Sequence, residues 1–66
     1  METIKCTIWK MGNDLYRITV NDIMYRKLDT GCISNINVLF ESMEEIKNII
    51  AEEINASVVF ETLIKE

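Results

Sequence analysis

The sequence predicts a small α+β domain, in which an antiparallel sheet of four to five strands carries one helix packed across one face. The expected order is β-β-β-β-α-β. Apolar and polar residues alternate in several short segments, as they do in strands with one buried face. Residues 40–55 instead have the apolar period of an amphipathic helix. With only 66 residues, these elements form a single domain spanning residues 1–66.

The first two strands are expected at residues 3–11 and 15–20, joined by turn residues at 12–14. A two-residue loop would place apolar side chains opposite charged ones, and a one-residue slip moves every side chain to the other face. A three-residue loop with Asn13 or Asp14 in the left-handed region keeps both faces consistent. The pairs in this register are Cys6–Val20, Thr7–Thr19 and Ile8–Ile18.

Two further strands are expected before the helix. A two-residue turn at Asn21-Asp22 leads into residues 23–28, which would pair with the second strand as Val20–Ile23 and Ile18–Tyr25. Residues 36–40 alternate as a short fourth strand running into the helix. Residues 57–65 fit either a strand or a helix, and their β-branched side chains favour the strand.

The helix is expected at Ser42–Ile54. Ser42 and Glu45 have the spacing of a capping box, and Asn55 suits a left-handed cap at the other end. The helix is expected to turn an apolar stripe toward the sheet. Its members are Met43, Ile46, Ile49, Ile50 and Ile54.

One helix about 10 Å wide cannot cover both faces of a sheet of four or five strands. The face expected under the helix consists of Ile4, Cys6, Ile8, Ile18, Val20, Ile23 and Tyr25. The opposite face would then be apolar, aromatic and basic together. It is expected to carry Trp9, Met11, Leu15, Met24 and Leu28, with Lys5, Thr7, Arg17, Thr19 and Arg26 between them.

Three interpretations of this second face stay open. Trp9 could stack under Arg17 as a cation–π pair that shields the sheet. The face could bind a protein, either a second copy or another chain, because Trp, Met and Arg are enriched at interfaces. It could also stack single-stranded nucleic acid, although the net charge of −4 opposes that. The candidate partner-binding residues are Trp9, Met11, Leu15, Arg17, Met24 and Arg26.

Charge is distributed unevenly, with a net of +2 over residues 1–28 and −6 over residues 29–66. Glu44, Glu52 and Glu53 are therefore further candidate partner-binding residues, as an acidic helix can imitate phosphates toward a basic protein channel. Small acidic chains rich in Ile, Asn, Lys and Glu are frequent among phage and mobile-element accessory proteins. The sequence thus favours a protein-binding module that inhibits a larger host protein. A structural or regulatory homodimer is the alternative.

Catalytic, cofactor-binding and metal-binding residues are not expected. The chain has no histidine, both glycines stand alone, and its two cysteines lie far apart in the sequence, which excludes imidazole bases, phosphate loops and CxxC sites. Without a recognisable secretory signal or membrane span, the expected location is the cytoplasm, with no membrane partner and no small-molecule substrate. Cys6 is expected to be buried and inert, and Cys32 to be accessible.

Overall fold

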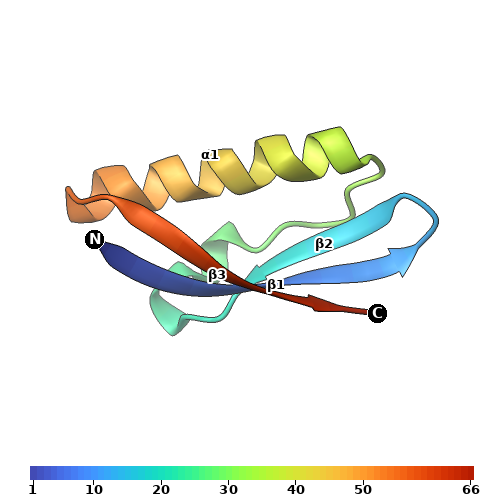
Figure 1. Ribbon diagram of the computed structural model, residues 1–66, viewed down its shortest axis with the longest axis horizontal. Helices are drawn as coiled ribbons and strands as arrows, with labels where there is room; N and C mark the ends of the chain where they lie inside the picture. Colours follow the sequence, from blue (N-terminus) through green and yellow to red (C-terminus); the bar gives the residue numbers. More distant parts are fainter.

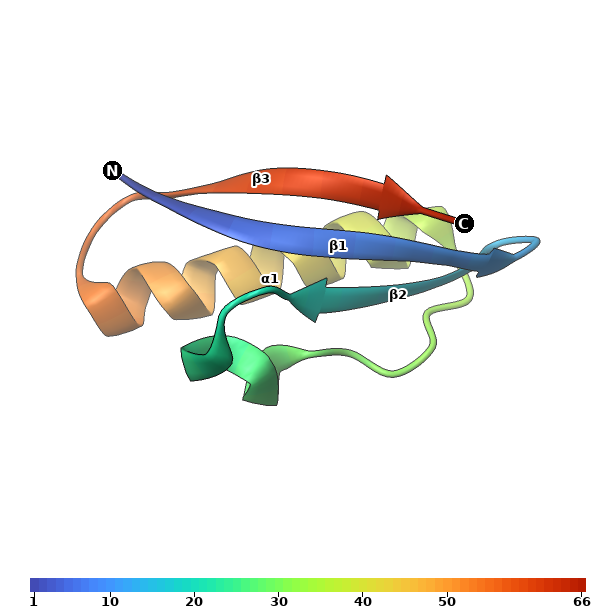
Figure 2. The same ribbon diagram turned by 90° about the horizontal axis from the view of Figure 1, so that it is seen from below.

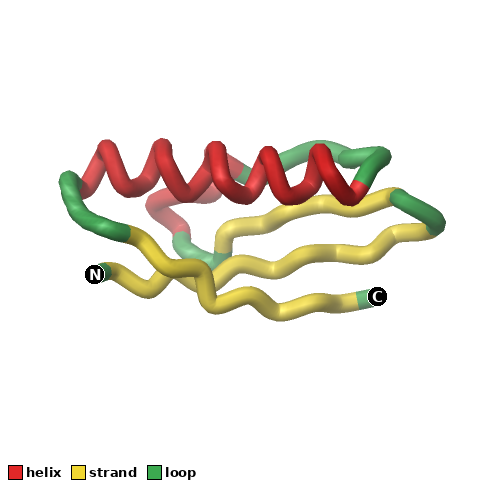
Figure 3. The backbone as a smooth tube through the Cα atoms, turned by 45° about the horizontal axis from the view of Figure 1, so that its top comes forward, coloured by secondary structure: helices red, strands yellow, loops and turns green.

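The computed structural model describes all 66 residues and has two layers, a three-stranded sheet and one α-helix that lies across one face of it (Figures 1 and 3). In chain order the elements are β1 (Glu2–Gly12), β2 (Leu15–Val20), the 3₁₀ helix η1 (Ile23–Leu28), α1 (Ile36–Ile54) and β3 (Val58–Lys65). The α+β prediction is confirmed. The sheet differs from the prediction because it has three strands, in the order β2-β1-β3, and is mixed.

The β1–β2 hairpin has the predicted register, including Cys6 opposite Val20 and Trp9 opposite Arg17. Asp14 adopts a φ of 51° in the turn, one of the two positions expected in the left-handed region. The pairing shifts by one residue between Lys10 and Gly12, so the hairpin ends in a bulge. Matching side-chain types across the two strands was sufficient to find this register, because a one-residue slip would have exchanged the faces.

The ambiguous C-terminal segment is a strand, β3, and it runs parallel to β1 without any shift in register. Figure 2 shows the two strands side by side and pointing the same way. A parallel neighbour requires a long crossover, and α1 carries the chain from the β2 side of the sheet to the far side of β1. The prediction of an entirely antiparallel sheet was therefore wrong.

The predicted third strand, residues 23–28, is instead the short helix η1. The Asp22 side chain accepts a hydrogen bond from the Met24 backbone N–H at 3.0 Å, which favours a helical turn over an extended one. Tyr25 is buried in the core, whereas Ile23 is 78% exposed and does not belong to the face under α1. The predicted pairs with β2 do not form, because residues 29–33 lie along the outer edge of that strand instead.

The predicted fourth strand, residues 36–40, is the first turn and a half of α1. Asn35 caps the helix by accepting the Asn37 N–H at 2.7 Å, so Ser42 lies inside the helix and the predicted capping box is wrong. Leu39 is buried, with 3% of its surface exposed. It extends the apolar stripe toward the N-terminus at helical spacing, and this periodicity prevails over the alternation of Ile36, Val38 and Phe40.

α1 packs on the sheet through Ile46 and Ile50, with Ile54 partly buried, as expected. Ile49, at the margin of the stripe, is 41% exposed, so the buried stripe is narrower than predicted. The helix ends at Asn55, whose φ of 53° and ψ of 47° confirm the left-handed cap. The core contains Ile4, Ile8, Tyr16, Ile18, Val20, Tyr25, Ile33, Leu39, Ile46, Ile50 and Val58.

Candidate protein-binding site

The outer edge of β2 is covered. The Ile18 N–H donates to Thr30 Oγ1 at 2.9 Å, and the Ile18 carbonyl accepts the Thr30 N–H at the same distance. The Val20 N–H donates to Asp29 Oδ1 at 2.8 Å. Farther along, Tyr16 exchanges two backbone hydrogen bonds with Ile33. The segment that follows η1 runs alongside β2 (Figure 2). It gives each outward backbone N–H of this edge a partner inside the chain.

The outer edge of β3 is open. No strand lies beyond it, and its only neighbour is β1. The Glu2 N–H donates to the Ser57 carbonyl at 2.9 Å, and in a parallel ladder this bond fixes which residues turn their backbone groups toward β1. Those are the odd-numbered residues of the strand. The even-numbered residues turn both N–H and C=O outward, and they are Val58, Phe60, Thr62 and Ile64.

Most of the features that protect natural edge strands are absent from β3. Such strands are kept from pairing by charged side chains, proline, bulges, short length or a covering segment. β3 has eight residues, no proline and an unbroken register with β1. Its two charged residues before the terminus, Glu61 and Lys65, are odd-numbered and lie on the face away from α1. The outward backbone groups of β3 therefore have no strand to pair with in this chain.

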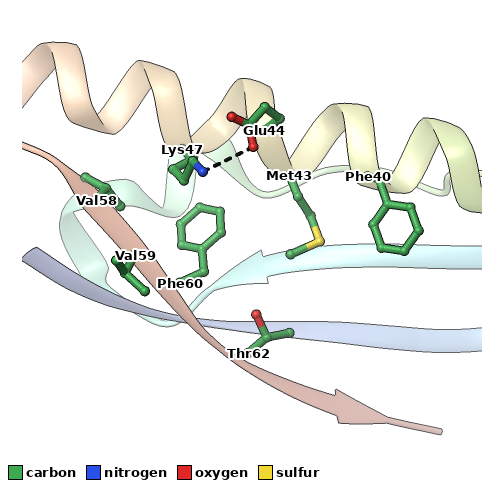
Figure 4. Close-up of a pocket in the computed structure, with 8 residues that line it drawn as sticks. All are labelled: Phe40, Met43, Glu44, Lys47, Val58, Val59, Phe60 and Thr62. Atoms are coloured by element: carbon green, nitrogen blue, oxygen red, sulfur yellow. Dashed lines mark ion pairs between the residues drawn. The ribbon is translucent and has the colours of Figure 1, made fainter.

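An apolar groove runs along this open edge, between β3 and the flank of α1 (Figure 4). Phe40 and Met43 point from the helix toward the sheet, and Phe60 points from β3 toward the helix. Phe40 is 58% exposed. The lining residues are Phe40, Met43, Glu44, Lys47, Val58, Val59, Phe60 and Thr62. A strand added to β3 would place every second side chain in this groove.

The two charged residues at the rim of the groove form an ion pair with each other. Glu44 Oε2 and Lys47 Nζ are 3.2 Å apart, one turn from each other along α1. Of the three candidate acidic residues, only Glu44 lies at the groove. Glu52 and Glu53 are exposed in the last turn of the helix, away from it. The structure therefore does not gather the three carboxylates into one surface.

Trp9 lies on the sheet face away from α1, as predicted, with 37% of its surface exposed. Its indole N–H donates to Thr19 Oγ1 at 2.8 Å. The cation over the ring is Lys65, with Nζ 5.5 Å from the ring centroid. Arg17 is not that cation, because its Nε donates to the Thr30 carbonyl at 3.2 Å. The predicted pairing of Trp9 with Arg17 across the ladder is correct. Stacking of Trp9 on Arg17, one of the three open interpretations, does not form, because Lys65 takes that position.

The centre of this second face is covered by its own side chains. Thr7 is only 3% exposed and accepts a hydrogen bond from Asn21 Nδ2 at 2.9 Å. Its neighbours across the ladders are Thr19 and Leu63. The apolar surface that stays open is at the margins, where Leu63 and Met11 are each 52% exposed.

The other predicted residues of the second face are elsewhere. Met24 and Arg26 lie on η1, since residues 23–28 do not join the sheet, and Met24 is 71% exposed near the C-terminal end of α1. Leu15 is half-buried opposite Gly12, beyond the bulge. Sequence reasoning missed the groove residues Phe40, Met43 and Phe60 as a group. The sequence signal that could have found them is Leu39. It lies four residues before Met43 and continues the apolar stripe toward the N-terminus, and Phe40 then falls on the flank of the helix.

Cys6 is fully buried and Cys32 is exposed, as predicted. Burial raises the pKa of the Cys6 thiol, and a contact of 3.6 Å with Thr62 Oγ1 opposes that shift in part. No three His, Cys, Asp or Glu side chains gather as a metal site would require. Neither helix combines the length and the apolar character needed to cross a membrane.

Comparison of this chain with models of protein families, with curated proteins and with solved structures finds no match.

Proposed function

We propose that this chain is a non-enzymatic protein-binding module that binds an extended segment of protein as an additional strand on β3. The observation that carries this proposal is the contrast between the two edges of the sheet. Residues 29–33 satisfy the β2 edge, whereas the outer edge of the eight-residue strand β3 remains open beside an apolar groove. Strand addition to an exposed sheet edge is a recurrent mode of peptide recognition.

In this mode, backbone hydrogen bonds supply much of the affinity, and alternate side chains of the added segment supply specificity. The outward groups of Phe60, Thr62 and Ile64 would form the ladder. On the helix side, the added side chains would contact Phe40 and Met43, so the site favours apolar residues at alternate positions of the bound segment.

Thr62→Pro is the variant that tests this proposal. The Thr62 N–H points outward, so proline would remove a donor that the added strand requires while leaving the ladder with β1 intact. Thr62→Ala is the matched control, because it removes the same side chain, including its contact with Cys6, and keeps the N–H.

The measurement is binding of peptides selected from a displayed random library against the wild-type protein. Peptides that bind wild type and Thr62→Ala, but bind Thr62→Pro at least about tenfold more weakly, would agree with loss of ladder hydrogen bonds. Circular dichroism establishes that each variant is folded. As a second measurement on the unaltered protein, hydrogen exchange at the Phe60, Thr62 and Ile64 amides should slow when peptide is added. Equal binding to Thr62→Pro would refute strand addition, as would rapid exchange at these amides that neither added peptide nor a higher protein concentration slows.

An accessory protein of a phage or mobile element would use such a module to occupy and inhibit a host protein. That role stays a prediction from composition, as does the use of the acidic helix as a phosphate mimic. Charge reversal at Glu44, Glu52 and Glu53 would test the mimic. A partner held by electrostatic contact should bind the reversed variant more weakly, and its binding to wild type should weaken with salt.

A further inference from the structure

We infer that the segment that pairs with β3 is the β3 strand of a second copy of this chain, in an antiparallel, two-fold symmetric arrangement. This inference rests on the proposed function and names its partner. It follows from the identity of the outward-facing residues, the distribution of charge along β3 and the state of the opposite edge of the sheet.

The two-fold axis can pass only through a residue that lies opposite itself, because paired residues must share a face of the sheet. An axis at Glu61 places two carboxylates directly opposite each other, which is destabilising. An axis at Thr62 places Glu61 opposite Leu63, so that the charge has no partner. An axis at Leu63 places Glu61 opposite Lys65 of the second copy, once on each side of the axis.

The axis at Leu63 also agrees with the backbone. Odd-numbered residues of β3 direct their hydrogen-bonding groups toward β1, so Glu61, Leu63 and Lys65 form the non-hydrogen-bonded pairs of the new ladder. Side chains are closest in such pairs, which brings the Glu61 carboxylate and the Lys65 ammonium of the two copies within reach. The outward groups of Thr62 then exchange hydrogen bonds with Ile64 of the second copy, and the reverse.

This register also covers one end of the groove. Ile64 is 67% exposed in the single chain, and in the pair it would lie beside Thr62 of the other copy. Thr62 lines the groove together with Phe40 and Met43, so Ile64 would contact these apolar side chains. The symmetry repeats the contact, and each copy would cover the Thr62 end of the other copy's groove.

The resulting sheet has six strands in the order β2-β1-β3-β3-β1-β2. Both of its outer edges are β2 edges, which residues 29–33 of each copy already cover. Residues 60–66 pair across the axis, and only Val58 and Val59 at the start of β3 lie outside the paired stretch. The arrangement therefore closes as a dimer, whereas a foreign strand on β3 would bring an edge of its own.

A charge exchange between Glu61 and Lys65 tests the partner and the register together. We expect wild type to sediment as a dimer in analytical ultracentrifugation. Glu61→Lys and Lys65→Glu each place like charges opposite each other and should weaken the dimer at least about tenfold. The double variant restores opposite charges and should recover dimerisation. Glu61 and Lys65 are both exposed in the single chain, and circular dichroism would establish that the variants are folded.

A cysteine series locates the axis independently. In a Cys32→Ser background, Leu63→Cys places two thiols opposite each other across the axis, at a separation of about 4.5–5.5 Å between Cβ atoms. Mild oxidation should link the two copies through this position. Val59→Cys, on the same face of the same strand, is the matched control and should not link. Linkage through Val59→Cys as fast as through Leu63→Cys would overturn the register.

The outcomes separate this inference from the function on which it rests. Wild type that is monomeric at its highest soluble concentration overturns the second copy as partner, and peptide binding that remains sensitive to Thr62→Pro then preserves the module. A dimer that the double charge variant fails to recover also overturns the inference. If Thr62→Pro leaves the affinity for peptide unchanged, the proposed strand-addition function is overturned.

Discussion

Ile50→Ala is expected to destabilise the protein by about 3 kcal/mol. Ile50 lies near the middle of the sheet-facing side of α1, and none of its surface is exposed. Removing three buried carbons costs about 2.5 kcal/mol at about 0.8 kcal/mol per methylene. A residual cavity of roughly 50 Å³ adds about 1 kcal/mol. The higher helix propensity of alanine returns a few tenths of a kcal/mol.

Ile49→Ala is the matched control, because it makes the same chemical change one residue earlier in the same helix. Ile49 is 41% exposed, so less transfer free energy is lost and no closed cavity forms. We expect a cost of about 1 kcal/mol after the same gain in helix propensity. The pair therefore compares burial alone, with composition and helix position held nearly constant.

Urea unfolding followed by circular dichroism measures both variants. A 66-residue domain is stable by only about 3–10 kcal/mol, so Ile50→Ala removes a large part of the total. With a slope of about 1 kcal/mol per M urea, the midpoints of the two variants should differ by about 2 M. All samples must share one protein concentration, because self-association adds stability that depends on it. Equal midpoints for the two variants would refute the packing of α1 through Ile50.

Two further predictions concern the cysteines and the start of α1. In the native protein a soluble thiol reagent should label Cys32 rapidly and Cys6 only through unfolding, because Cys6 is buried and its raised pKa disfavours the thiolate; equal labelling rates, followed by mass spectrometry, would contradict this. Asn35→Ala should cost about 1 kcal/mol of stability in urea unfolding through loss of the N-cap, whereas Ser42→Ala should cost much less, and the reverse order would return the helix start to Ser42.

Some features of the fold could be predicted from short stretches of the sequence. The hairpin register followed from the side-chain types on either side of a single turn. A shift of one residue between the two strands would move apolar residues off their shared face. The left-handed cap at Asn55 followed from the tolerance of asparagine for positive φ. The assignment of β3 followed from β-branched residues, and the burial of Cys6 followed from its place among alternating apolar residues.

Where a short segment fits two structures equally well, its packing against the rest of the chain selects one of them. Residues 36–40 alternate as a strand does, yet burying Leu39 against the sheet extends α1 through them. Residues 23–28 could have paired with β2, but Thr30 and Asp29 hold that edge. The direction of β3 depended on where α1 ends relative to β1. The position of that helix end cannot be predicted from any short segment.

The candidate site shows the same division most clearly. From the sequence, Trp9, Arg17 and the helix carboxylates could be named as a possible surface, but the open edge and its groove could not. Whether a strand lies at an edge depends on the strand order, because an edge strand has a neighbouring strand on one side only. Phe40, Met43 and Phe60 become a groove only after the parallel placement of β3 sets that edge beside the flank of α1.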